Sequence, residues 1–144
     1  ARWLYIRNEF PQRPHLQPNA YKDGKKIIER LRQLHVEKKL DDLAERLLFS
    51  PTRPAEELYD WTTDPHQVSN LAPDPAHAEA LAELRARLDR WIAESGDRGA
   101  KPETEAMFES DMAVYLDQMN RSAERRAVIV RNIAQMKAWA SEGK

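Results

Sequence analysis

Residues Glu56 to Gly96 read EELYDWTTDPHQVSNLAPDPAHAEALAELRARLDRWIAESG, and this stretch decides how the chain folds. Its first six residues, Glu56 to Trp61, alternate in character and predict a short strand. In the turn region that follows, Asp74 and Pro75 have the order of a helix N-cap and a first helical residue. Apolar residues then recur at helical spacing as far as Ser95, and Gly96 is a typical helix end.

The N-terminal residues predict a second strand. In RWLYIRN, Arg2 to Asn8, alternation places Trp3 and Tyr5 on one side and the aliphatic residues between them on the other. Two isolated strands form no stable sheet in water, where about three or more are needed. We therefore expect this chain to be cut from a longer one that supplies further strands.

The remaining sequence predicts helices joined by polar loops. Besides the helix at about 75–95, helical spacing predicts helices at about 25–38, 41–49, 102–119 and 122–141. Prolines 11, 14 and 18 make the segment after the first strand an extended loop. The expected fold class is α+β and helix-rich, with two short antiparallel strands packed with about five helices.

Composition excludes several classes of function. The chain has 144 residues, 23 basic and 24 acidic side chains and no cysteine. Balanced charge predicts no nucleic-acid partner, and the lack of a long apolar run predicts no membrane span. Without cysteine there is no disulfide, thiolate zinc site or cysteine nucleophile. The four histidines, at 15, 35, 66 and 77, do not have the spacing of a zinc site.

One loop is a candidate binding site. Arg13 and His15 lie in the proline-rich segment that follows Asn8, with further polar residues nearby. A guanidinium presents a planar fork to sulfate or carboxylate oxygens, so such a loop suits an anionic or sugar-like ligand. The alternative is that this is simply a polar surface loop. On the residues alone, both interpretations stay open.

The stretch from Arg53 to Asp97 resembles the C-terminal signature of sulfatases, in which a strand of the type ELYDL precedes a turn of the type DPxExxNLA and a helix. The matching residues are Glu57, Leu58, Tyr59, Asp60, Asp64, Pro65, Asn70, Leu71 and Ala72. Trp61 and Gln67 depart from the pattern, standing where Leu and Glu are common. RWLYIRN and the loop after it are similar to the corresponding segments of the heparan N-sulfatase-like group.

The resemblance implies a division of the chain and a fold. Residues 1–97 would be the C-terminal subdomain of an alkaline-phosphatase-like sulfatase, a small antiparallel sheet packed with a helix. Residues 98–144 would be a helical C-terminal extension, similar to bacterial members. The loop would lie toward the catalytic cleft, so Arg13, His15 and Asn8 become expected substrate-binding residues.

The resemblance also implies an active site that this chain lacks. Sulfatases use a formylglycine made from a C/S-x-P-x-R motif and a bound calcium ion, and neither the motif nor a calcium site is recognisable here. We expect both cofactors in a missing N-terminal catalytic domain, which would be the partner of this piece. Through that parent enzyme the chain would act on a sulfated small molecule or glycan.

A second hypothesis is a self-standing helical module that binds a partner protein with its last two helices, whose methionines suit an adaptable interface. An excised subdomain should expose an apolar patch and form homo-oligomers through it, whereas a self-standing module should be a stable monomer. The sequence does not assign a compartment, and a periplasmic or extracellular parent is compatible with it.

Overall fold

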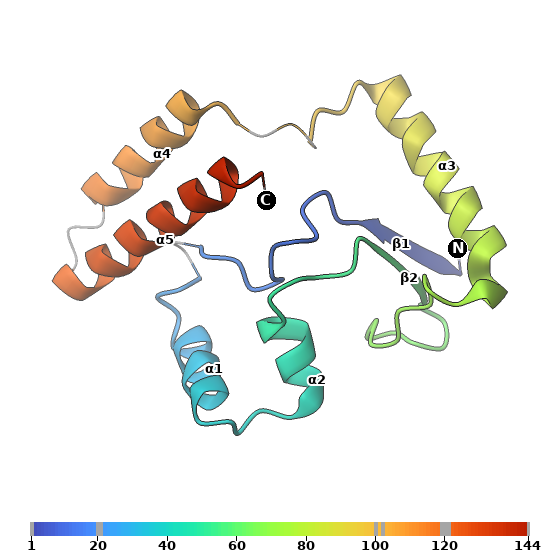
Figure 1. Ribbon diagram of the computed structural model, residues 1–144, viewed down its shortest axis with the longest axis horizontal. Helices are drawn as coiled ribbons and strands as arrows, with labels where there is room; N and C mark the ends of the chain where they lie inside the picture. The colour runs from blue at the N-terminus through green and yellow to red at the C-terminus, as the bar shows by residue number, and fades with distance from the viewer. Residues whose placement is uncertain (1, 20–21, 100, 102, 119–121, 144) are drawn as a thin grey trace. The chain divides into compact units, whose positions relative to one another are not determined.

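Figure 1 shows the computed structural model of the chain, which describes residues 2–19, 22–99, 101, 103–118 and 122–143. The chain divides into two compact units. The first comprises Ala1–Pro11 and Pro54–Pro102, and the second comprises Gln12–Arg53 and Glu103–Lys144. Each unit therefore joins segments that are distant in sequence. The division into 1–97 and 98–144 rests on family resemblance and stays a prediction.

The first unit contains the predicted pair of strands. β1 (Trp3–Arg7) and β2 (Glu56–Asp60) are antiparallel, with Trp3 opposite Asp60 and Arg7 opposite Glu56 (Figure 1). Directly opposed residues of an antiparallel pair point to the same face of the sheet. One face therefore carries the odd-numbered residues of β1 and the even-numbered residues of β2.

The helix that the periodicity of the sequence predicts packs on β1. It starts as a short 3₁₀ turn, η2 (Pro75–His77), and continues as α3 (Ala78–Ser95). The Asp74 side chain accepts a hydrogen bond from the Ala76 backbone N–H, and Gly96 closes the helix with a left-handed φ of 65°. These two residues cap the helix as the sequence indicates.

The core of the first unit is small. Leu58 on β2 is fully buried and Leu81 on α3 is 9% exposed. Trp91, one of the apolar residues that recur at helical spacing along this helix, is instead 55% exposed. An 18-residue helix is about 27 Å long, whereas five-residue strands span about 17 Å. The helix runs alongside β1 from His77 near Trp3 to Asp89 near Arg7, so its last turns extend beyond the sheet.

The second unit is helical. Its elements are α1 (Lys26–Val36), α2 (Asp42–Ala44), which continues as the π-helix η1 (Glu45–Phe49), α4 (Glu105–Gln118) and α5 (Ala123–Ser141). They confirm the predicted helices to within a few residues at their ends. Pro102 and Met119, the expected ends of one helix, lie outside the described residues.

Polar contacts connect the segments of the second unit. The Asp23 carboxylate, 6% exposed, accepts hydrogen bonds from Arg32 on α1 and Asn132 on α5. Although burial opposes ionisation, hydrogen bonds from Asn19, Arg32 and Asn132 hold the pKa of Asp23 below its usual value. Ionised Asp23 therefore links the loop to two helices.

His35 is also engaged within this unit. Its ring stacks on Phe49 with centroids 4.1 Å apart, and its Nδ1 lies 2.7 Å from a carboxylate oxygen of Glu45. These contacts join the end of α1 to η1, so His35 has a packing role near the C-terminus of α1.

Candidate functional site

The proline-rich loop begins at Asn8, whose side chain is held by neighbouring protein groups. Its Nδ2 donates hydrogen bonds to the Pro54 carbonyl oxygen (2.7 Å) and to Glu57 Oε1 (2.6 Å). The backbone N–H of Asn8 donates to the Ala55 carbonyl at 2.9 Å. The Tyr59 hydroxyl donates to the other oxygen of Glu57, a carboxylate that is only 5% exposed. Asn8 thus anchors the start of the loop.

Arg13 and His15 lie further along the loop, in the second compact unit, whereas Asn8 belongs to the first. The guanidinium carbon of Arg13 is 5.7 Å from the centroid of the Trp139 ring, a cation–π contact with α5. Burial and the nearby charge of Arg53 both lower the pKa of Arg13. His15 is exposed two residues further along the loop.

The described residues contain no metal centre. Among residues 2–19, 22–99, 101, 103–118 and 122–143, no group of three or more His, Asp or Glu side chains is placed to hold a metal ion. Within the same ranges, no helix is both long and apolar enough to cross a membrane.

The residues that resemble the sulfatase signature have a clear structural use, and Asn70 shows it best. Its Oδ1 accepts hydrogen bonds from the backbone N–H groups of Leu58 (3.0 Å) and Ala72 (2.9 Å), while its Nδ2 donates to the Glu56 carbonyl (3.0 Å). The Leu71 N–H donates to the Leu58 carbonyl at 2.8 Å. The segment Asn70–Ala72 therefore covers the outer edge of β2, because it bonds the backbone groups of β2 as a neighbouring strand would.

The two aspartates of the signature organise the turn between β2 and Asn70. Asp60 accepts hydrogen bonds from Thr62 and Arg2, and these lower its pKa. Asp64 accepts from the backbone N–H groups of Ser69 and Val68, which lower its pKa in turn. A carboxylate bonded to backbone donors in this way stays ionised and fixes the loop.

A cluster that the sequence did not predict joins the sheet to α3. Both side-chain nitrogens of Arg85 that face β2 donate to the Glu56 carboxylate, at 2.8 and 2.6 Å, and the Tyr5 hydroxyl donates to the same carboxylate. The Arg85 guanidinium, with the hydrogen bond from Tyr5, lowers the pKa of Glu56 to about 2. Burial, with the adjacent carboxylate, raises the pKa of Tyr5.

This cluster corrects one ion pair that the spacing of residues along α3 predicts. The i,i+4 spacing predicts a pair between Arg85 and Asp89 on the outer face of the helix. Instead Arg85 binds Glu56, and Asp89 accepts a hydrogen bond from Arg7 of β1 at 2.6 Å. Arg85 lies four residues after Leu81, on the apolar side of the helix. A charged residue within an apolar stripe, such as Arg85, indicates that its partner lies on the element against which the helix packs.

Comparison with curated proteins finds three sulfatases. The chain is 36% identical over 104 residues to an ulvan-active sulfatase from Formosa agariphila, a match that covers 72% of this chain and 17% of the relative. It is 52% identical over 42 residues to a Delta 4,5-hexuronate-2-O-sulfatase from Bacteroides thetaiotaomicron (29% of this chain, 9% of the relative). It is 49% identical over 41 residues to the human N-sulphoglucosamine sulphohydrolase (28% of this chain, 8% of the relative).

The chain spans less than a fifth of the length of the curated relatives that it matches. No protein-family model and no solved structure matches it.

Proposed function

Because this chain is homologous to sulfatases and consistent with their C-terminal region, we propose that it is part of an enzyme that hydrolyses sulfate esters or sulfamates, with a carbohydrate as substrate. Hexuronate and sulphoglucosamine, which occur in the names of two relatives, are sugars. Within that enzyme, we assign to this piece a structural role and one loop that faces the substrate.

The structural role is supported by the hydrogen bonds that the signature residues make to the backbone. Asn70 bonds three backbone groups around β2, and Asp64 bonds two in the turn. Side chains used in this way build a local fold rather than a reaction centre. Their resemblance to the sulfatase signature is then explained by the need to close the same strand edge.

The loop carries the proposed contribution to substrate binding. Arg13 offers a cationic fork, held near the Trp139 ring, and His15 offers an exposed imidazole two residues away. A sulfate or sulfamate group carries oxygens that accept hydrogen bonds from such donors. Asn8 belongs to this proposal as the residue that anchors the loop, because both hydrogens of its amide are already engaged.

In this proposal, the formylglycine and the calcium site of the family lie outside this chain. The chain has no cysteine and no Ser-x-Pro-x-Arg sequence from which a formylglycine could form. Its described residues provide no calcium site. A catalytic domain outside this chain would supply both, and that domain would be the main partner of the piece.

The first experiment is to characterise the natural gene product by intact mass and N-terminal sequence, and to assay it on a 2-O-sulfated hexuronate disaccharide and on N-sulfated glucosamine. We expect a much longer product with an upstream C/S-x-P-x-R motif that releases sulfate from at least one sugar. A natural gene product of about 144 residues would refute the proposal that the chain is part of an enzyme and would favour the self-standing interaction module.

The loop is tested in the full-length enzyme with the double variant Arg13→Ala/His15→Ala. Loss of two groups that contact the substrate should lower kcat/KM by about tenfold or more, since each hydrogen bond to a charged group is worth about 1.5–3 kcal/mol. Gln12→Ala, an exposed neighbour in the same loop, is the matched control. Unchanged kcat/KM in the double variant, with an unchanged melting temperature, would remove Arg13 and His15 from the substrate site.

A further inference from the structure

The proline-rich loop is held on α5 at two points. At the first, the guanidinium carbon of Arg13 lies 5.7 Å from the centroid of the Trp139 ring. At the second, Asn132 Nδ2 donates a hydrogen bond of 2.5 Å to the Asp23 carboxylate. Asn132 and Trp139 stand at positions i and i+7 of the helix, which places them on the same face. Both contacts therefore hold the loop on one side of α5.

A groove of about 520 Å³ lies beside the same face of α5. Leu16 and Pro18 of the loop line this groove, and so do Gln135 and Trp139 of the helix. Gln135 stands four residues before Trp139, so the two side chains are neighbours on the surface of α5. Residues of the loop between the two contacts are thus also next to the helix, and the Trp139 ring lies where the loop and α5 meet.

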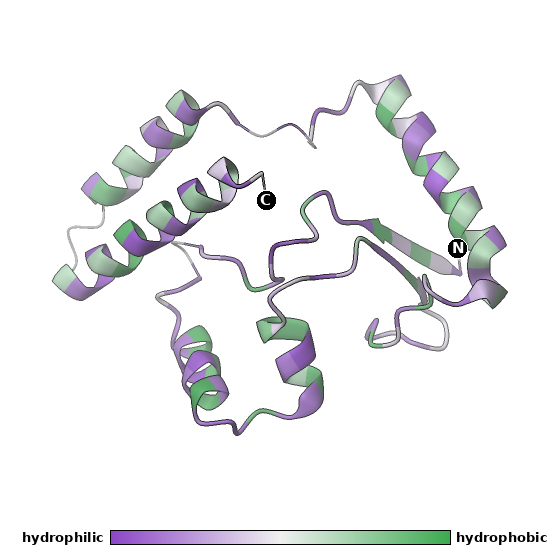
Figure 2. Ribbon diagram, in the orientation of Figure 1, coloured by the Kyte–Doolittle hydropathy of each residue, from purple (hydrophilic) through white to green (hydrophobic). Residues whose placement is uncertain are grey.

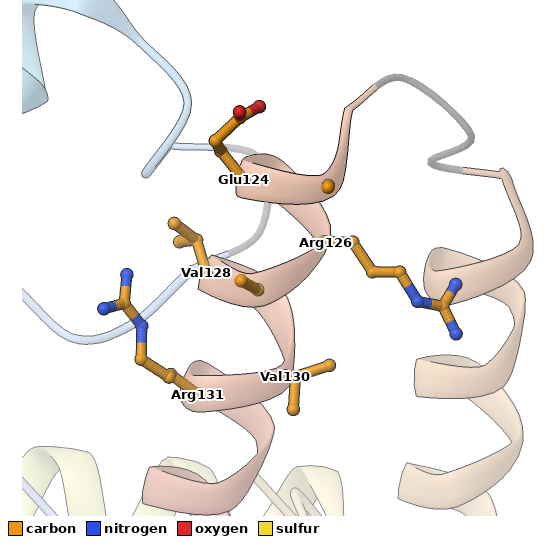
Figure 3. Close-up of a pocket in the computed structure, with 7 residues that line it drawn as sticks. Glu124, Arg126, Val128, Val130 and Arg131 are labelled. Carbon is orange, nitrogen blue, oxygen red and sulfur yellow. The ribbon is translucent and has the colours of Figure 1, made fainter.

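α5 contacts α4 with a different side. In Figure 3 the side chains of Arg126 and Arg131 extend to opposite sides of α5. Arg126 donates to the Leu116 carbonyl oxygen of α4 at 3.1 Å, whereas Arg131 lines the groove beside the loop. Figure 2 shows hydrophobic and hydrophilic residues mixed along α5, as expected for a helix with two different contact surfaces. The side that holds the loop is therefore separate from the side that contacts α4.

The contact with Trp139 suits a side chain that has to stay cationic. Burial and the nearby charge of Arg53 lower the pKa of Arg13, and repulsion between the two like charges favours rotamers that take the Arg13 guanidinium away from Arg53. The face of an aromatic ring attracts a guanidinium and, unlike a carboxylate, does not neutralise its charge. Trp139 therefore holds the Arg13 side chain against this repulsion and leaves it positively charged.

We propose that Trp139 is a positioning residue for substrate binding, which orients the Arg13 guanidinium toward the sulfate or sulfamate group of the substrate. Asn132 supports it by fixing the end of the same loop through Asp23. This inference rests on the proposed function, because it requires Arg13 to contact the substrate. It extends that function to the C-terminal helix, which acts on the substrate through the loop that it holds and not through a group of its own.

The test is a double-mutant cycle in the full-length enzyme, with kcat/KM measured on the sulfated sugar that the enzyme hydrolyses. Trp139→Leu keeps an apolar side chain but removes the ring face, whereas Trp139→Phe keeps a ring. We expect Trp139→Leu to lower kcat/KM by about threefold to tenfold and Trp139→Phe to retain most of the wild-type value. In an Arg13→Ala background, Trp139→Leu should have no further effect, because the side chain that it orients is already gone.

Ile129→Val, at a buried position of the same helix, is the matched control for a general loss of stability in α5. It should lower the melting temperature and leave kcat/KM unchanged. Unchanged kcat/KM in Trp139→Leu, with a lower value in Arg13→Ala, overturns the positioning role and leaves the proposed function intact. So do independent effects of the two substitutions, or a loss of kcat/KM in Ile129→Val as large as that in Trp139→Leu. Unchanged kcat/KM in Arg13→Ala contradicts the proposed substrate loop itself, and the positioning role with it.

Discussion

Replacing Asn70 with Ala isolates the way in which the signature stabilises β2. The substitution removes one acceptor that serves two backbone N–H groups and one donor that serves a carbonyl. One of these backbone groups, the N–H of Leu58, lies in a residue with no exposed surface. Water therefore cannot readily replace the hydrogen bond that this N–H loses. The other two, at Ala72 and Glu56, lie in partly exposed positions.

The expected loss follows from these three bonds. An intramolecular hydrogen bond contributes about 0.5–1.5 kcal/mol, and a buried donor left without a partner costs about 1–3 kcal/mol. Asn70→Ala should therefore lower the free energy of unfolding of the first unit by about 2–4 kcal/mol. Asn70→Asp keeps the acceptor and loses the donor, so its loss should be smaller, about 1–2 kcal/mol.

Urea unfolding followed by tryptophan fluorescence measures the effect. Trp3, Trp61 and Trp91 all lie in the first unit, so a Trp139→Phe background confines the signal to it. The free energy in water comes from linear extrapolation at equal m-values. Ser69→Ala, an exposed neighbour, should change stability by less than about 0.5 kcal/mol. The same small effect for Asn70→Ala would refute the reasoning.

Three further outcomes follow from single contacts. The folded-state pKa of Glu56 is lowered to about 2, so the stabilisation from its carboxylate is present above the usual pKa of 4.5 and is lost as pH falls toward 2. Glu56→Gln should therefore flatten the loss of stability between pH 5 and pH 2, measured by urea unfolding. Gly96→Ala places a side chain at φ 65° and should cost about 1 kcal/mol, whereas Gly99→Ala should be close to neutral, and equal effects would contradict this. Asp23→Ala removes a buried acceptor of several hydrogen bonds and should destabilise the second unit by about 2 kcal/mol, read from Trp139 fluorescence.

The elements of the fold were predictable because their signals are local. Alternating residues in RWLYIRN and EELYDW gave both strands, and the pair Asp74–Pro75 with Gly96 gave both ends of the long helix. Helical spacing gave the remaining helices to within a few residues. Each of these signals depends on neighbours within a few positions, which a single sequence contains.

The candidate site was predictable in part. Polarity and proline content identified the loop of Arg13 and His15, and the resemblance to sulfatases agrees with the relatives found by comparison. Their role in substrate binding stays a prediction. The cluster of Tyr5, Glu56 and Arg85 was not foreseen, because its members lie up to 80 positions apart and meet only when β1, β2 and α3 are assembled.

The sequence by itself determined the periodicities, the helix caps and the signature, since these depend on short-range spacing and on residue type. The tertiary structure alone decided which charges pair. Arg85 turns to Glu56 and Asp89 to Arg7, rather than to each other along the helix, because the packing of α3 on the sheet brings these partners within hydrogen-bond distance. It also decided what stays exposed: strands of five residues cannot cover a helix of 18, and Trp91 is left outside the small core as a result.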